Sequence, residues 1–266
     1  MSKVITFGAL GLLLAGPGLP ALAGAAPDSI EKVVSDIKRA DYKGDRPALE
    51  ALYQKLEPFL TGKVSPSRVR YWRGFAMWRE AVNGFNDAVT PTILGDELTL
   101  AVSEFDQAIA LDRDFVDAKI AEASCLMSLT YINLSAPDKV KELVTRFVQL
   151  LKESQAEAPE NPRFYWVNGA GLWFSPAAGG GQDAAIAGYE KGLNVCRRRK
   201  DRPRGSLDPT WGEPELLMSL AWSNLNRRTP DVSAAEGYAK QALKLVPYWH
   251  YVRDILLPQI IRAKKA

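Results

Sequence analysis

Three segments that lie far apart in this chain share one spacing of small residues, and this pattern constrains the fold more than any other feature. The segments are AVSEFDQAIALD (101–112), AIAGYEKGLNV (185–195) and AAEGYAKQALKLVP (234–247). In each, three residues spaced four and then three positions apart lie on one stripe of a helix, and the outer two are small. Small residues let a helix approach its neighbours closely, so each segment is predicted to be a helix packed on both sides. The positions are Ala101, Phe105 and Ala108; Ala185, Tyr189 and Gly192; and Ala235, Ala239 and Ala242.

The chain after Ser29 has apolar residues at i, i+3, i+4 and i+7 and almost no strict alternation of apolar and polar residues. We therefore expect an all-α protein. Asp28 and Asp45 are suitable helix N-caps, and Gly44 lies in the short turn between the first two helices. The expected helices, paired as five hairpins with one last helix, are residues 29–40 and 46–60, 66–82 and 95–111, 115–131 and 137–155, 162–174 and 183–198, 213–227 and 231–246, and finally 249–264.

The second helices of these hairpins resemble those of the tetratricopeptide repeat, which carry Ala, an aromatic residue and Ala, and then a proline that ends the unit. Pro159 and Pro247 stand at this terminal position, and Arg113 stands there in ALDRDFVDA. In the family, a bulky residue follows six positions after the proline, and a small residue follows four positions later. Counting from Pro159 reaches Tyr165 and Gly169, which both fit.

The sequence also departs from the family pattern. Counting from Arg113 reaches Lys119, which is a poor substitute for the bulky residue, although Ala123 fits the small position. Several loops are stretched, and segment 137–155 lacks the small residues. The resemblance implies a right-handed solenoid of antiparallel helical hairpins (TPR-like), in which stacked hairpins bury a shared core and the helix at 249–264 caps the C-terminal end.

The first residues, MSKVITFGALGLLLAGPGLPALAGAAPDS, have the pattern of a cleavable signal peptide. Lys3 precedes an apolar run at 4–14, and ALA at 21–23 is a small-x-small cleavage site. The run is shorter than the roughly 20 residues that a membrane span needs, and an uncleaved anchor is the alternative. No cysteine lies near this site, which argues against a lipoprotein. We expect residues 1–23 to be a signal peptide, residues 24–266 to be a single TPR-like helical-repeat domain, and the mature protein to be periplasmic or secreted, without stable membrane insertion.

The sequence lacks the residue patterns of the common catalytic and metal sites. Its one histidine, His250, lies in VPYWHYVRD, where we expect a helix cap packed among aromatic residues. A single histidine excludes an HExxH motif and a zinc site built from several histidines, and no CxxC, GxSxG or Walker motif occurs. We therefore expect no catalytic residue, no metal and no cofactor, and hence not an enzyme. The net charge of +3 gives no indication of nucleic-acid binding.

Two features leave alternatives open. Cys125 and Cys196 either form a disulfide, which export to an oxidising compartment permits, or remain two buried thiols. The basic run at 197–204, RRRKDRPR, is either a solvated helix end or a contact for anionic lipid headgroups or an acidic partner.

The stretch FSPAAGGGQDAAIAGYEKGL (174–193) carries a finer resemblance. A proline, a glycine cluster, a capping Asp183 and then a second helix are similar to the interrupted repeats of exported bacterial proteins, including the T component of TRAP transporters. That resemblance implies a small-ligand-binding accessory protein of a transporter. We expect the glycines at 179–181 to form a structural turn; the alternative is an anion site on free backbone N–H groups.

The tetratricopeptide resemblance also predicts a binding surface, because in that fold the first helix of each hairpin lines a concave groove. Aromatic residues exposed in a cleft often mark binding sites. The alternative is that the stretched loops or the last helix fill the groove and make these aromatic residues ordinary core. The phase set by Tyr165, with Leu217 as the matching residue of the fifth hairpin, places seven candidates in the groove: Arg163, Trp166, Trp173, Met218, Trp222, Ile120 and Met127.

Two functions follow from these patterns. The first is a non-catalytic protein- or peptide-binding scaffold of the bacterial cell envelope, whose concave groove holds an extended partner. The second is a binder of a small apolar ligand that serves a transporter, which requires a closed, apolar pocket of a few hundred Å³ rather than an open groove.

Overall fold

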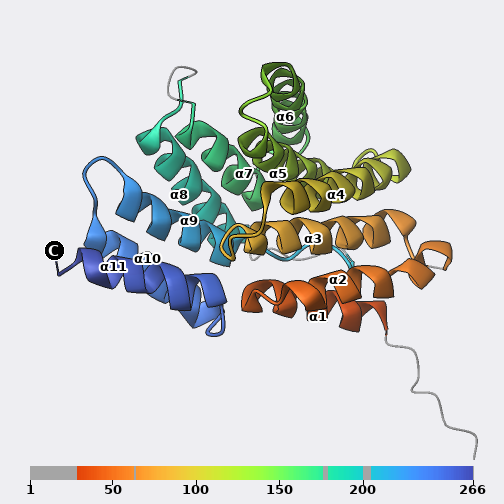
Figure 1. Cartoon of the computed structure of the whole chain (residues 1–266), viewed down its shortest axis with the longest axis horizontal. Coiled ribbons are helices and arrows are strands. Elements are labelled where there is room, and N and C mark those ends of the chain that lie inside the picture. Colours follow the sequence, from red (N-terminus) through yellow and green to blue (C-terminus); the bar gives the residue numbers. More distant parts are fainter. Residues whose placement is uncertain (1–28, 63, 176–178, 200–204, 266) are drawn as a thin grey trace, which may run out of the picture.

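The computed structural model describes residues 29–62, 64–175, 179–199 and 205–265 (Figure 1). Within these residues the secondary structure is helical, and no strand occurs. Consecutive helices pack in pairs, so the chain is an all-α helical-repeat solenoid, as the sequence predicts. The predicted signal peptide at 1–23 lies outside the described residues. In the part of the chain that the structure describes, no helix combines the length and the apolar character needed to cross a bilayer.

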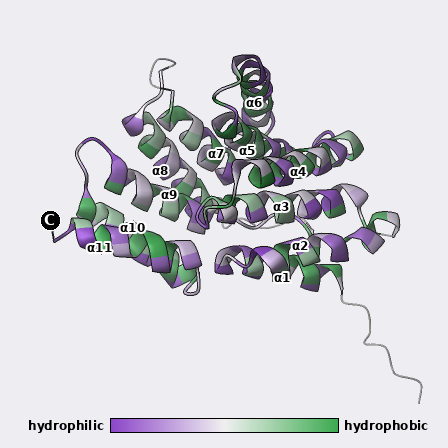
Figure 2. Cartoon of the chain, in the orientation of Figure 1, coloured by the Kyte–Doolittle hydropathy of each residue, from purple (hydrophilic) through white to green (hydrophobic). Residues whose placement is uncertain are grey.

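The helices form five successive pairs and a C-terminal segment. The pairs are α1 (Ile30–Lys43) and α2 (Arg46–Lys55), α3 (Pro66–Gly84) and α4 (Pro91–Leu111), α5 (Val116–Ile132) and α6 (Pro137–Glu157), α7 (Pro162–Trp173) and α8 (Gln182–Arg199), and α9 (Glu213–Asn226) and α10 (Val232–Leu245); a 3-10 turn, η1 (Glu57–Thr61), follows α2, and the C-terminal segment consists of η3 (Tyr251–Leu256) and α11 (Leu257–Ala263). In Figure 2 these helices carry both hydrophobic and hydrophilic residues, as expected for helices that bury one face.

The first helix ends show how local sequence sets the boundaries. Gly44 ends α1 with φ +71°, a left-handed conformation that glycine adopts without strain. Asp45 then caps α2 as predicted, because its Oδ1 accepts a hydrogen bond from the backbone N–H of Ala48 at 3.1 Å. Ser29, rather than the predicted Asp28, is the N-cap of α1, and its Oγ accepts from a backbone N–H of the first turn at 3.3 Å. Asp28 itself lies outside the described residues.

Two predicted helices are interrupted at prolines. The helix expected at 46–60 ends at Lys55 and is followed by the 3-10 turn that contains Pro58. The helix expected at 249–264 begins with the π-helical turn η3 and becomes α-helical only at Leu257, next to Pro258. Proline lacks the N–H of an α-helical hydrogen bond, and its ring conflicts with the carbonyl four residues earlier, so regular α-helix is disfavoured just before it.

The small and aromatic positions of the repeat pattern fit into one another across the α7–α8 pair. A Cβ added at Gly169 of α7 would lie 2.4 Å from Cε1 of Tyr189 on α8. A Cβ added at Gly192 of α8 would lie 2.7 Å from Cβ of Tyr165 on α7. Each helix therefore presents a glycine to the aromatic residue of its partner, and the two backbones come close together.

The concave side of the solenoid is partly filled by residues 205–212, which we call the inner segment. Its Leu207 accepts a 2.7 Å hydrogen bond from the indole Nε1 of Trp72 on α3. Oδ1 of its Asp208 accepts a 3.0 Å hydrogen bond from Nε of Arg68, which is also on α3. Leu207 and Trp211 are buried together with the aromatic core of α3. The inner segment therefore covers the concave face of α3.

The two ends of the solenoid also meet. The rings of Tyr42, at the end of α1, and Trp249, before η3, lie 5.0 Å apart between centroids and pack edge to face. Next to them, a Cβ added at Gly44 would lie 3.1 Å from the His250 ring. In Figure 1 the first hairpin and the C-terminal helices lie along the same side of the molecule. The concave side is therefore closed by the contact between its first and last elements.

Candidate binding cavity

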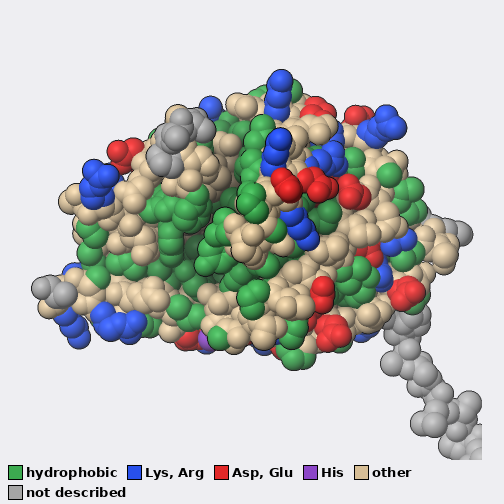
Figure 3. Space-filling view, turned by 45° about the horizontal axis from the view of Figure 1, so that its top comes forward, with side chains coloured by type: hydrophobic (Ala, Val, Ile, Leu, Met, Phe, Trp, Pro, Cys, Tyr) green, Lys and Arg blue, Asp and Glu red, His purple; other side chains and the backbone are tan. Residues whose placement is uncertain are grey.

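A cavity of about 360 Å³ remains on the concave side. Its walls come from the first helices of four hairpins, α3, α5, α7 and α9, together with Tyr189 of α8 and the start of the C-terminal segment. Figure 3 shows a hollow on one face of the molecule with hydrophobic side chains gathered around it. Eight of the residues that line the cavity are aromatic.

The structure brings five of the seven predicted groove residues together at this cavity. The three tryptophans among them are only half-buried, whereas the other four tryptophans of the chain, Trp72, Trp78, Trp211 and Trp249, are buried. The five residues that line the cavity are Met127, Trp166, Trp173, Met218 and Trp222.

The other two predicted residues, Arg163 and Ile120, do not line the cavity. Nε of Arg163 lies 2.7 Å from Oδ1 of Asp117, and its Nη1 donates to the carbonyl oxygen of Trp211 at 2.9 Å. Arg163 is therefore a buried residue that holds the inner segment. Ile120 is fully buried in the core.

Contacts between rings and hydroxyl groups fix the walls of the cavity. Trp173 and Trp222 pack edge to face with their centroids 5.1 Å apart. Trp166 lies 5.5 Å from Trp211 of the inner segment, and its Nε1 donates to Oγ of Ser219 at 2.9 Å. Because the rings are already oriented, a ligand does not have to order them on binding.

Arg79 is the one charged residue among those that line this cavity. Its Nε donates to Oδ1 of Asp41 on α1 at 2.8 Å, and both side chains are buried. The amide of Asn83 donates to the same carboxylate oxygen at 3.2 Å. Burial opposes the charge of Arg79, yet Asp41 raises the pKa of Arg79 above its ordinary value, so the guanidinium stays protonated.

A second carboxylate lies near this pair but does not line the cavity. Oε1 of Glu215 accepts the hydroxyl of Tyr42 at 2.6 Å, and its Oε2 accepts the backbone N–H of Gly212 at 2.7 Å. Burial raises the pKa of Glu215, whereas the hydrogen bond from Tyr42 and the charge of Arg79 lower it. The region around Arg79 thus holds one cation and two carboxyl groups.

Sequence reasoning missed Arg79, and it gave the entry of the last helix into the groove only as an alternative. Arg79 precedes Glu80 in a helix rich in arginine, and nothing in the pattern separates it from Arg70 or Arg73. Trp249 and Tyr251 were expected to surround a helix cap, and they instead line the cavity. The start of the C-terminal segment therefore enters the groove, as that alternative has it, but a cavity remains between it and α7.

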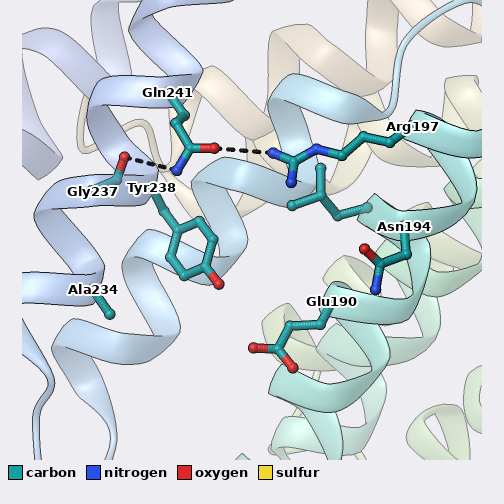
Figure 4. Close-up of a pocket in the computed structure, with 8 residues that line it drawn as sticks. Glu190, Asn194, Arg197, Ala234, Gly237, Tyr238 and Gln241 are labelled. Carbon is teal, nitrogen blue, oxygen red and sulfur yellow. Dashed lines mark hydrogen bonds between the residues drawn. The ribbon is translucent and has the colours of Figure 1, made fainter.

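A second pocket lies between the second helices of two hairpins, α8 and α10 (Figure 4). Its Gln241 accepts from Nη2 of Arg197 at 3.0 Å and donates to the carbonyl oxygen of Gly237 at 3.3 Å, as the dashed lines show. Arg197 also lies 3.7 Å from Glu213. Arg197 and Gln241 thus already bind one another, and Tyr238 is the one aromatic residue among those that line this pocket, so it offers a flat apolar ligand less than the aromatic cavity does.

The remaining expectations concern single residues. His250 does not cap a helix through its side chain; its Nδ1 lies 2.8 Å from Oδ2 of Asp254. Asp183 lies in the first turn of α8 and accepts from Arg227 at 2.8 Å. Cys125 and Cys196 are buried and do not form a disulfide with each other. Among the described residues, no group of His, Cys, Asp and Glu side chains is arranged to hold a metal ion.

Comparison with known proteins defines the class of fold. No protein-family model matches the chain, and no curated protein sequence matches it. The solved structure of the HusA haemophore from Porphyromonas gingivalis has a TM-score of 0.59 at 18% identity, and the match covers 79% of this chain and 98% of that chain. Yeast Tom70 has a TM-score of 0.35 at 13% identity, over 93% of this chain and 60% of its own. The HusA match agrees with a helical-repeat fold, and at this identity it shows the fold alone.

Proposed function

We propose that this protein is a non-catalytic carrier of a small, largely apolar molecule with a flat ring. The observation that supports this most strongly is the cavity of about 360 Å³, which is walled by the half-buried rings of Trp166, Trp173 and Trp222. Small-molecule sites have volumes of about 300–1,000 Å³ and combine apolar walls with a few polar groups. Aromatic side chains that are held edge to face leave flat surfaces on which another ring can pack.

This is the second of the two functions predicted from the sequence, and the shape of the concave side favours it over the first. An extended peptide needs a groove that runs open along several hairpins. Here the inner segment covers the concave face of α3. Trp249 and Tyr251, at the start of the C-terminal segment, form another wall of the cavity. The space that is left suits a small molecule better than an extended chain.

A protein partner is the second candidate. Phe85 and Phe174 line the cavity and are 38% and 74% exposed. A partner that inserts one apolar side chain between them would use the same walls. This mode needs a surface around the opening of the cavity as well as the cavity itself, so it predicts a complex of two chains rather than a bound small molecule.

The sequence suggests where the protein acts, and one similar structure suggests a ligand to test. The signal-peptide pattern at 1–23 favours a periplasmic or secreted protein of a bacterial envelope. One similar structure is a haemophore, so haem belongs in the set of ligands to be tested. The stretch at 174–193 is similar to part of a transporter component, and a carrier that delivers its ligand to a transporter fits this resemblance.

Native mass spectrometry of protein purified from its host envelope tests the proposal. We expect a retained mass of a few hundred daltons and, after its removal, quenching of tryptophan fluorescence by an added flat-ring ligand. The double variant Trp166→Ala/Trp222→Ala should lose both signals while remaining helical by circular dichroism. Tyr131→Ala is the matched control, because this aromatic residue is 68% exposed and does not line the cavity. A retained polypeptide would favour the protein partner, and equal capture by all three proteins would contradict both.

A further inference from the structure

The charged residue that lines the cavity, Arg79, indicates the chemistry of the ligand, and this step rests on the proposed function. We propose that the ligand is a neutral ring compound that carries a carbonyl oxygen, as a ketone or a quinone does, and that this oxygen accepts hydrogen bonds from the guanidinium of Arg79.

The first observation is that the two terminal nitrogens of Arg79, Nη1 and Nη2, make no hydrogen bond to the described residues. It is only 5% exposed, and Asp41 takes up Nε alone. Among the described residues no acceptor pairs with Nη1 or Nη2, and neither atom is fully enclosed. Arg79 lines the cavity, and we infer that its terminal nitrogens are reached from this space.

The second observation is that two other polar side chains that line the cavity, those of Asn83 and Ser128, are already engaged. Nδ2 of Asn83 donates to Oδ1 of Asp41 at 3.2 Å and to the backbone oxygen of Arg79 at 2.9 Å. Ser128 donates to the backbone oxygen of Ser124 at 3.2 Å. The polar side chains that line the cavity without a hydrogen bond to the described residues, such as Asn86 and Tyr251, are neutral, so the charged guanidinium of Arg79 is the stronger donor.

These donors select for an acceptor. In the empty cavity water can satisfy them, but an apolar ligand that expels the water leaves them without a partner. A buried donor that loses its partner is costly, and hydrogen bonds from charged groups are stronger than those from neutral ones. A ligand whose oxygen replaces the water keeps these bonds, and a pure hydrocarbon does not.

The charges around Arg79 decide between a neutral and an anionic acceptor. Asp41 lies 2.8 Å from Nε and already balances the guanidinium. A ligand carboxylate would therefore be a further buried anion without a counterion of its own, which is unfavourable in an apolar site. A carbonyl oxygen accepts the same hydrogen bonds and brings no charge.

Three two-ring probes of similar size test this inference: 2-acetylnaphthalene, which has a neutral carbonyl, 2-ethylnaphthalene, which has no acceptor, and 2-naphthoate, which is an anion. Their dissociation constants are measured with the wild-type protein by equilibrium dialysis and by quenching of tryptophan fluorescence. We expect the ketone to bind about tenfold more tightly than the hydrocarbon, as one retained hydrogen bond to a charged donor implies, and the anion to bind most weakly.

Two variants separate the hydrogen bond from the charge. Asp41→Asn removes the counterion and leaves the shape of the site, so the preference should move about tenfold or more from the ketone toward naphthoate. The double variant Asp41→Asn/Arg79→Met removes the donor and its partner together, so the ketone and the hydrocarbon should bind with equal affinity. Circular dichroism and thermal unfolding check that each variant is folded.

The outcomes are distinguishable. If the wild-type protein binds naphthoate more tightly than the ketone, or binds the ketone and the hydrocarbon equally, the inference is overturned while ring binding in the cavity stands. If none of the three probes binds, the proposed function fails and the inference fails with it. Because the wild-type series alone decides these cases, a variant that unfolds does not leave the inference untested.

Discussion

The indole Nε1 of Trp211 donates a 2.8 Å hydrogen bond to the hydroxyl of Tyr71, which lies 140 positions earlier in the chain. Both side chains are buried. Arg163 binds the backbone oxygen of the same tryptophan at 2.9 Å, so the inner segment is held from both α3 and α7. This contact between distant parts of the sequence helps to turn an open groove into a cavity.

Trp211→Phe should lower the free energy of unfolding by about 1–3 kcal/mol, because it leaves the Tyr71 hydroxyl buried without its partner. Urea unfolding of Trp211→Phe, Tyr71→Phe and the double variant measures this as a double-mutant cycle. We expect the two changes to be coupled by about 0.5–2 kcal/mol, since both remove one hydrogen bond. Additive effects would mean that the bond contributes nothing to stability.

Gly169→Ala should destabilise the protein by about 1–3 kcal/mol, because its Cβ would lie 2.4 Å from the ring of Tyr189 and force the two helices apart. Gly95→Ala in α4 is the matched change, since nothing lies within 4 Å of the added Cβ. Alanine is preferred to glycine inside a helix, so this variant should be more stable by about 0.5–1 kcal/mol. Thermal unfolding should show shifts of opposite sign, and two shifts of the same sign would contradict the packing described for α7 and α8.

Features that depend on residues close in sequence could be predicted. The hairpins follow from the helical period, and the count from Pro159 to Tyr165 placed Trp166 and Trp173 on one side of α7, where both now line the cavity. Asp45 and Gly44 marked a helix boundary, because capping and left-handed turns depend on two or three neighbouring residues.

Features that depend on contacts between residues far apart in the sequence could not be predicted. The phase of the repeat also placed Arg163 toward the concave side, but the inner segment covers it there and accepts its hydrogen bond. The path of this segment is set by single bonds, such as that from Trp72 to Leu207, and such pairings leave no periodic pattern. The ion pair between Arg79 and Asp41 likewise joins α3 to α1. The chain has many other arginines, and the sequence does not indicate which of them pairs with Asp41.

Arg79→Met should destabilise the protein by about 3–5 kcal/mol, because it leaves the buried carboxylate of Asp41 without a counterion. The double variant Asp41→Asn/Arg79→Met should recover most of this loss, since a neutral pair of similar volume needs no counterion. Urea unfolding at pH 7 measures both. A double variant as unstable as Arg79→Met would show that the guanidinium stabilises the fold by packing rather than by its charge.

Glu80 gives the stability of the protein a dependence on pH. Its Oε1 lies 3.7 Å from Nη2 of Arg46, which also binds Glu97, and Oε2 of Glu80 is enclosed without a partner among the described residues. Burial, followed by the charge of Glu97, raises the pKa of Glu80 from 4.5 to about 7, although Arg46 lowers it. The folded state therefore holds this proton more tightly than the unfolded state does. The stability contributed by Glu80 is fully present below pH 4.5 and is lost as the pH rises to about 7.

Glu80→Gln should consequently leave stability unchanged near pH 4.5 and raise the free energy of unfolding at pH 8 by about 1–2 kcal/mol, because the neutral amide avoids the cost of the buried charge. Urea unfolding of both proteins across this range measures the difference. Glu236→Gln is the control of opposite sign: hydrogen bonds from Lys240 and Lys264 lower the pKa of this half-buried carboxylate to about 2. Its removal should therefore bring no gain at pH 8. A gain from Glu80→Gln that is equally large at both pH values would show that the shape of the side chain, and not its ionisation, is responsible.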